Sequence, residues 1–106
     1  MDHFNYHDGV LSAEDVPLPR IAAEVGTPVY VYSANAFRDH ARAFRAGLAD
    51  VRDAHLAYAI KANPNVAVLR LLAAEGYGAD VVSGGELARF ILALKVVLAQ
   101  VGTVPT

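Results

Sequence analysis

The chain of 106 residues contains no cysteine, and this absence excludes several chemistries. Without thiols there is no disulfide framework, no thiol nucleophile and no cysteine-based zinc site. A chain that lacks cysteine also fits a cytoplasmic protein. Four histidines are scattered along the sequence, and their spacing indicates surface positions, so we expect no metal site.

Signals for membrane or nucleic-acid binding are also missing. The first residues are polar and acidic, so we expect no signal peptide. No apolar run reaches the roughly 18 residues that a transmembrane helix needs. Nine basic residues against eleven acidic ones give a net charge of −2, which offers no basic surface to a nucleic acid. We therefore expect neither a membrane nor a nucleic acid as partner.

The composition is that of a folded protein of modest size. Apolar residues make up 55% of the chain and charged residues 19%, which is too apolar and too weakly charged for a disordered segment. The length allows one ordinary domain. Because a β/α barrel of typical size needs about 250 residues, a closed barrel is excluded.

Turn signals and hydrophobic periodicity predict alternating strands and helices. Near the start we expect short strands at 4–6 and 10–11 around the turn Asp8-Gly9, then a helix that ends at Gly26. The later strands are expected at 29–32, 54–60 and 79–82, and the later helices at 34–48, at 66–75 and from 84 to at least 94. Such alternation predicts βαβ units around a parallel sheet.

The helix over 34–48 is predicted to be amphipathic. Its apolar residues Phe37, Ala41, Phe44 and Leu48 recur at helical spacing, with charged residues between them. We expect this stripe to cover one face of the sheet.

A lysine follows the predicted strand 54–60, at the edge where parallel sheets bind ligands. Apolar surroundings disfavour the ammonium form of Lys61, and a neutral amine can form a Schiff base with an aldehyde or ketone. The alternative is a structural lysine whose side chain extends to water.

Two more groups lie at the ends of predicted strands. Asp80 lies within the apolar strand 79–82, where we expect it to be buried and to need either Lys61 or backbone amides as its partner. Ser83 and Glu86 have the spacing of a helix capping box. The segment Ser83-Gly84-Gly85 could also hold an anion at the helix start, although capping and tight packing explain it better.

Two motifs carry a resemblance to a known family. They are Tyr58-Ala59-Ile60-Lys61-Ala62-Asn63 and Ala79-Asp80-Val81-Val82-Ser83-Gly84-Gly85-Glu86-Leu87. Both resemble the diaminopimelate decarboxylases, which belong to the pyridoxal-phosphate enzymes built on an alanine-racemase-like barrel. The resemblance covers residues 4–89, which correspond only to the first part of that family's longer chain.

The resemblance implies a partial (β/α) barrel of about three units, not closed, that binds pyridoxal 5'-phosphate. Lys61 would be the catalytic lysine that carries the cofactor covalently. Ala59 would lie near the cofactor ring, Asp80 would be the acid close to the lysine and the cofactor, and Ser83 would help to shape the helix start beside them. The implied reaction removes carbon dioxide from meso-diaminopimelate and yields L-lysine. A cytoplasmic homodimer is expected for the full-length family.

Other interpretations stay open. An amino-acid racemase or an ornithine or arginine decarboxylase of the same fold is one alternative, and a truncated, non-catalytic chain is another. After Arg89 the sequence departs from the family pattern, so we divide it into an N-terminal segment (1–28), the first β/α units (29–89) and a divergent apolar tail (90–106). Because the family's phosphate- and substrate-binding groups lie later in its chain, we expect the 106 residues alone to show no decarboxylase activity and little stable Schiff base.

Overall fold

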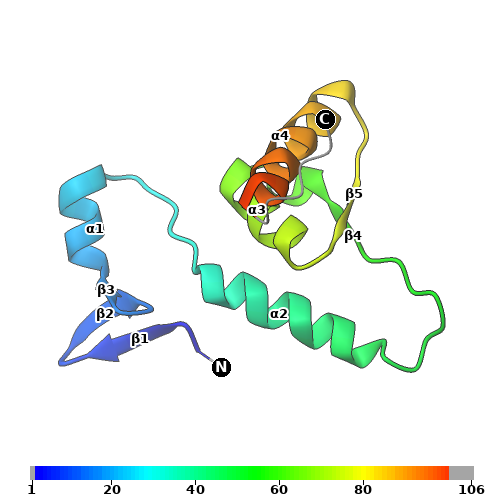
Figure 1. Cartoon of the computed structure of the whole chain (residues 1–106). Coiled ribbons are helices and arrows are strands. Elements are labelled where there is room, and N and C mark those ends of the chain that lie inside the picture. The colour runs from blue at the N-terminus through cyan, green and yellow to red at the C-terminus, as the bar shows by residue number, and fades with distance from the viewer. Residues whose placement is uncertain (1, 101–106) are drawn as a thin grey trace. The chain divides into compact units, whose positions relative to one another are not determined.

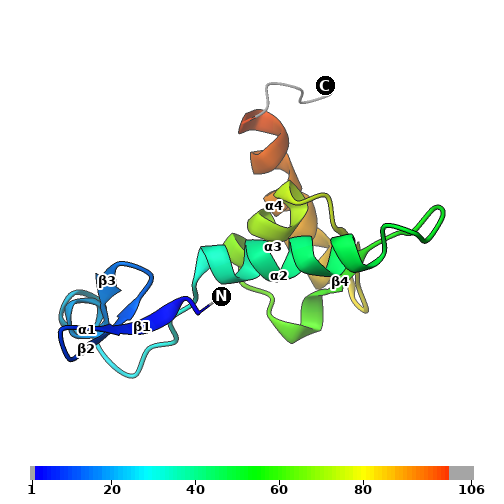
Figure 2. The same cartoon turned by 90° about the horizontal axis from the view of Figure 1, so that it is seen from below.

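The computed structural model describes the backbone of residues 2–100 and the side chains of residues 2–95. The chain divides into two compact units, Met1–Ala36 and Phe37–Thr106, and each is described by itself. Figures 1 and 2 show the elements of both units. No helix within residues 2–100 is long and apolar enough to cross a membrane.

The first unit begins with a small antiparallel sheet. Strand β1 (Phe4–His7) pairs with β2 (Val10–Ala13) through the predicted turn Asp8-Gly9, whose φ angles are 51° and 80°. A two-residue turn with both φ angles positive matches the twist of a hairpin. A third strand, β3 (Val16–Pro17), was not predicted from the sequence and pairs with the other edge of β2.

Helix α1 (Leu18–Val25) follows β3 without a loop. Pro19 lies in its first turn, where a missing amide hydrogen costs no helical bond. The helix ends as predicted at Gly26, which has a φ of 90° and donates its N–H to the carbonyl oxygen of Ala22 at 2.9 Å.

The predicted strand at 29–32 is wrong. These residues form no strand, and Tyr30 is 88% exposed and stacks on Tyr32 with 6.5 Å between ring centroids. β-branched and aromatic residues favour extended backbone, but a strand also requires a neighbour to accept its hydrogen bonds. Within residues 2–100, no strand pairs with this segment.

The second unit contains the predicted parallel pairing. Strand β4 (Ala57–Ala59) pairs with β5 (Gly78–Asp80), and Ala57, Tyr58 and Ala59 lie opposite Gly78, Ala79 and Asp80. Helix α3 (Val66–Ala74) connects them, so β4, α3 and β5 form one βαβ unit. The described sheets are open and none closes into a barrel.

Both strands are shorter than predicted. After Ala59 the backbone forms a 3₁₀ turn, η1 (Ile60–Ala62), so that Ile60, the last residue of the expected strand 54–60, lies in the turn. Strand β5 ends at Asp80, and Val82, which was expected within a strand, is 73% exposed. The strands are short because only three residues of β4 pair with three residues of β5.

The helices α2 (Ala34–Gly47), α3 and α4 (Gly84–Gln100) agree closely with the expected ranges, and α3 and α4 lie side by side in both views (Figures 1 and 2). Their side chains form two buried clusters. The α2–α3 cluster consists of Ala41, Val68 and Leu72, and the η1 cluster consists of Ile60, Leu69 and Ala93. Burying a side chain of leucine size contributes about 1.5–3 kcal/mol.

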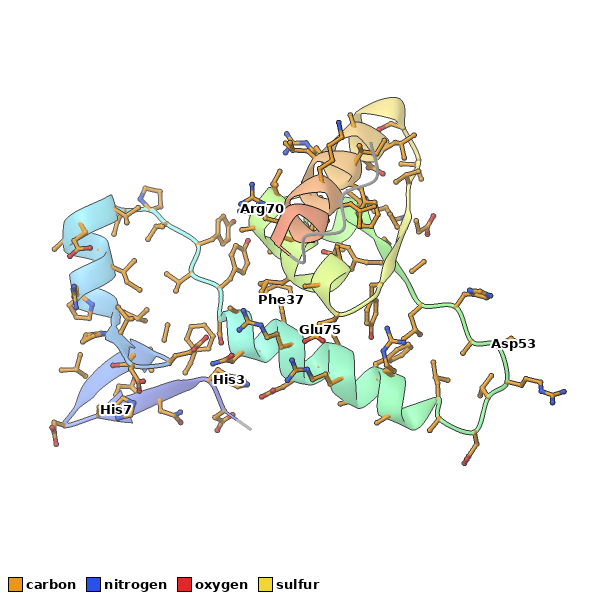
Figure 3. The ribbon with its side chains drawn as sticks, viewed as in Figure 1. His3, His7, Phe37, Asp53, Arg70 and Glu75 are labelled. Atoms are coloured by element: carbon orange, nitrogen blue, oxygen red, sulfur yellow. The ribbon has the colours of Figure 1, made fainter. Side chains whose placement is uncertain are left out.

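Polar contacts beside the α2–α3 cluster also hold helix α2 in place. Arg42 forms an ion pair with Glu75 at 2.8 Å, and Figure 3 shows Glu75 beside α2. The hydroxyl of Tyr77 donates to the carbonyl oxygen of Ala41 at 2.7 Å. Ala41 is buried and Phe37 packs against its cluster, but Phe44, which was expected on the same inner stripe, is 61% exposed. Phe37 and Leu48 are partly buried and Ala41 is buried, so Phe44 is the member of the predicted apolar stripe that lies exposed.

Candidate active site

Lys61 is the middle residue of η1, immediately after β4. Its neighbour Ile60 is completely buried in the η1 cluster and anchors the turn to the core. The side chain of Lys61 itself is exposed, so the apolar surroundings expected for it are absent. This follows from the turn, which directs residue 60 inward and leaves residue 61 on the surface.

The segment that carries Lys61 is held by hydrogen bonds on its C-terminal side. The N–H of Asn63 donates to the carbonyl oxygen of Ile60 at 3.1 Å, and the hydroxyl of Tyr58 donates to the carbonyl oxygen of Asn63 at 3.2 Å. Asn65 caps α3, because its side-chain oxygen accepts the N–H of Ala67 at 2.9 Å. The loop between β4 and α3 is thus fixed at both ends.

Asp80 is the last residue of β5, and the parallel register places it opposite Ala59. It is exposed, contrary to the expectation of burial. Within residues 2–100, β5 pairs only with β4, so nothing covers its other edge as another strand would. In the described part of the chain, the carboxylate of Asp80 forms no ion pair with Lys61 and no hydrogen bond, so neither of its expected partners is found.

The predicted cap at the start of α4 is confirmed. Ser83 Oγ accepts the N–H of Glu86 at 3.2 Å. The carboxylate of Glu86 accepts the N–H of Val82 at 2.9 Å, one residue earlier than the usual partner in a capping box. A Cβ added at Gly84 would meet no atom within 4 Å. Tight packing therefore does not explain this glycine, and the backbone at the helix start is accessible.

The parallel register brings the predicted site residues to one edge of the β4–β5 sheet. Ala59 and Asp80 lie opposite each other, Lys61 follows Ala59 by two residues, and Ser83 follows Asp80 by three. This edge combines an amine, a carboxylate and the positive end of a helix dipole. Tyr58 was not among the site residues predicted from the sequence, since its hydroxyl reaches the loop only because the backbone turns back after β4.

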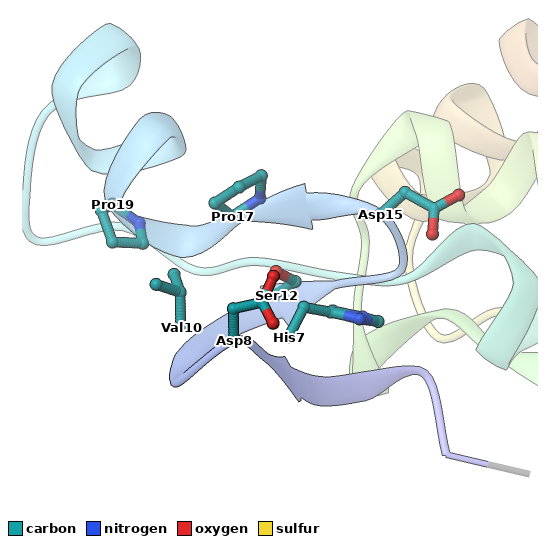
Figure 4. A pocket seen from close by; sticks show the side chains of 7 residues that line it. All are labelled: His7, Asp8, Val10, Ser12, Asp15, Pro17 and Pro19. Carbon is teal, nitrogen blue, oxygen red and sulfur yellow. The ribbon is translucent and has the colours of Figure 1, made fainter.

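A hollow in the first unit is separate from these residues. It has a volume of about 540 Å³ and lies at the antiparallel sheet and the start of α1 (Figure 4). Its lining residues are His7, Asp8, Val10, Ser12, Asp15, Pro17 and Pro19. None of the predicted site residues contributes to it. No group of three or more possible metal ligands occurs among the described residues.

Comparison with known proteins identifies the family. Residues 34–101 match the pyridoxal-binding domain of pyridoxal-dependent decarboxylases, a range that continues beyond Arg89 into the segment expected to diverge. The diaminopimelate decarboxylase of Vibrio cholerae is 48% identical over 108 residues, covering 96% of this chain and 25% of the relative. That of Zymomonas mobilis is 48% identical over 90 residues, covering 83% of this chain and 21% of the relative.

Solved structures show the same relationship. A protein from Aquifex aeolicus superimposes with a TM-score of 0.73 at 44% identity, covering 86% of this chain and 22% of its own. The diaminopimelate decarboxylase of M. jannaschii, in complex with L-lysine, has a TM-score of 0.74 at 36% identity, covering 87% and 22%. The chain thus spans about a quarter or less of the length of these relatives. By its match over residues 34–101, the chain belongs to the pyridoxal-dependent decarboxylases and contains part of their pyridoxal-binding domain.

Proposed function

We propose that this chain is the lysine-bearing opening part of a diaminopimelate decarboxylase. The observation that carries the proposal is the placement of Lys61, whose exposed amine follows β4 at the sheet edge that also carries Asp80 and the start of α4. In the proposed reaction, the bond between a carboxylate and the adjacent carbon of meso-diaminopimelate breaks. Carbon dioxide leaves, and a proton replaces it to give L-lysine. The relatives reported above support this choice over a racemase or an ornithine decarboxylase.

The residues at this edge fit pyridoxal phosphate. The exposed amine of Lys61 is accessible to an aldehyde, and the open backbone at Gly84 leaves room for an anionic group at the start of α4. When bound, pyridoxal phosphate supplies an aldehyde for covalent attachment and a ring that takes up the electrons of the broken bond. Lys61 would hold it and would move a proton at Nζ, while Asp80 would supply negative charge beside it. Ala59, opposite Asp80, would lie along the same edge.

We further propose that this chain forms the opening units of a (β/α) barrel. The parallel β4–α3–β5 unit supports this, as do TM-scores of 0.73 and 0.74 to solved relatives. The homodimer, the cytoplasmic location and the division at residues 28 and 89 stay predictions from the sequence.

A chimera tests the proposed function. Residues 1–89 of this chain would replace the matching part of the Aquifex aeolicus diaminopimelate decarboxylase, which is 45% identical over 85 residues. We expect the chimera to take up pyridoxal phosphate and to release carbon dioxide from meso-diaminopimelate. Lys61→Ala should abolish both, whereas Lys95→Ala, which alters the only other lysine of the chain, serves as a control in a chimera extended to residue 95. A chimera with native circular dichroism that takes up no cofactor would refute the proposal.

A further inference from the structure

The side chain of Tyr58 connects the core to the loop that carries Lys61. Its ring packs against both the α2–α3 cluster and the η1 cluster. From there its hydroxyl donates to the carbonyl oxygen of Asn63 at 3.2 Å, just after η1. The strand residue thus spans the whole 3₁₀ turn, from the residue before Ala59 to the residue after Ala62.

Such a turn needs support from outside. A 3₁₀ turn has poorer hydrogen-bond geometry than an α-helix and is stable only in short pieces. Here the N–H of Asn63 closes the turn by donating to the carbonyl oxygen of Ile60 at 3.1 Å. The carbonyl oxygen of Asn63 itself accepts the hydroxyl of Tyr58. Ile60 is completely buried on the other side of Lys61. The backbone of Lys61 is therefore held from both sides, while its amine remains exposed.

We propose that Tyr58 is a positioning residue for Lys61. By holding the Asn63 carbonyl group, its hydroxyl fixes the direction in which Lys61 leaves the turn, and therefore where its amine meets a carbonyl carbon. This inference rests on the proposed function, because only a reacting lysine needs such control. Errors of about 1 Å in the placement of a reacting group can cost a hundredfold in rate, so a single bond to the loop can matter to the reaction.

The chain offers a matched pair of variants. Tyr58→Phe removes only the hydroxyl that reaches Asn63 and keeps the ring in the core. Tyr77→Phe removes a hydroxyl from a ring packed against the same α2–α3 cluster, but that hydroxyl bonds to Ala41 on α2. A general loss of stability should appear in both variants, whereas an effect on the Lys61 turn should appear only in Tyr58→Phe.

The first measurement uses the 106-residue chain without cofactor. Amide hydrogen exchange is followed at Asn63, with Leu72 in α3 as an internal reference for global unfolding. In Tyr58→Phe we expect the Asn63 amide to exchange roughly twofold to tenfold faster relative to Leu72, the range that corresponds to one lost hydrogen bond. In Tyr77→Phe the ratio of the Asn63 exchange rate to the Leu72 exchange rate should equal that of the wild type. Equal ratios in both variants would overturn the inference.

The second measurement uses the chimera with pyridoxal phosphate, where the circular dichroism of the bound cofactor reports its orientation. We expect Tyr58→Phe to change this signal and to lower kcat more than it raises KM, whereas Tyr77→Phe changes neither. Faster exchange with an unchanged cofactor signal would reduce Tyr58 to a purely structural role and overturn the inference. A wild-type chimera that takes up no pyridoxal phosphate would refute the proposed function, and with it any role of Tyr58 toward the cofactor. Unaltered exchange in Tyr58→Phe beside normal cofactor uptake in the wild type would refute only the role of Tyr58.

Discussion

Adjacent residues of this chain have different roles, because one anchors the backbone in the core while the next is exposed and accessible for chemistry. Ile60 is completely buried, whereas the adjacent Lys61 is exposed, and the 3₁₀ turn between β4 and α3 produces this division. In the first unit, Glu14 has an anchoring role of another kind. Its carboxylate accepts the hydroxyl of Ser33 at 2.7 Å and both the backbone N–H and the side-chain amide of Asn35, at 3.2 Å and 2.7 Å.

These bonds make the stability of the first unit depend on pH. The hydrogen bond from Ser33, and then that from the backbone of Asn35, lower the pKa of Glu14 below its ordinary value of 4.5. Because the folded pKa is the lower one, the stabilisation is fully present above pH 4.5 and is lost as the pH falls through the folded pKa. Glu14→Gln should therefore lower the thermal midpoint at neutral pH and flatten its decline in acid. Glu24→Gln is the control, because it alters an exposed carboxylate that pairs with Arg20 alone among the described side chains. Parallel acid profiles for wild type and Glu14→Gln would contradict this account.

The two isoleucines of the second unit allow a test of the anchor beside Lys61. Ile60 is completely buried and Ile91 is 43% exposed. Ile60→Ala should cost about 2–5 kcal/mol in the free energy of unfolding, because it leaves a cavity in the η1 cluster. Ile91→Ala should cost far less. Denaturant unfolding measures both, and comparable losses would show that Ile60 does not hold the turn.

At the scale of elements, short hydrogen-bonded connections decide where each helix begins. Ser33, Asn65 and Ser83 each accept an N–H at a helix start, from Ala36, Ala67 and Glu86. The cap at Ser83 was predicted from the sequence. Such signals are readable because a cap depends on residues only two or three positions apart. Strand lengths were predicted less well, because a strand end depends on where its neighbour ends.

Two substitutions of Ser83 distinguish a capping role of the α4 start from a role in binding an anion. Ser83→Ala should cost about 1 kcal/mol and speed amide exchange at Glu86, because the cap is lost. Ser83→Asp preserves a capping oxygen and should keep the stability close to that of the wild type, but its negative charge should weaken uptake of the phosphate-bearing cofactor by the chimera. Undiminished uptake in Ser83→Asp would show that this helix start does not bind the phosphate group.

At the scale of the whole chain, many apolar side chains lie on the surface of each unit. Tyr30, Phe44, Val82 and Leu92 are exposed by 88%, 61%, 73% and 52%, respectively. The parallel sheet of the second unit has two strands and is open. Large exposed apolar surfaces and open sheet edges favour association between chains.

The exposure of Lys61 also bears on activity. An amine in contact with water lacks the water-excluded surroundings in which carbonyl chemistry is efficient. We therefore expect the purified 106-residue chain, supplied with pyridoxal phosphate and meso-diaminopimelate, to release no carbon dioxide above a blank containing Lys61→Ala. Release that depends on Lys61 would show that these residues suffice for the reaction.

The sequence by itself determined the approximate ranges of the helices, the cap at Ser83, the Asp8-Gly9 turn and the family, because each depends on residues close together in the chain. Only the tertiary structure decided that residues 29–32 form no strand, that Asp80 is exposed and that Phe44 is uncovered, since these depend on which elements lie beside them. The link from Tyr58 to Asn63 belongs to the second group. It exists because a buried isoleucine turns the backbone after β4 and returns the loop to within reach of the strand's own tyrosine.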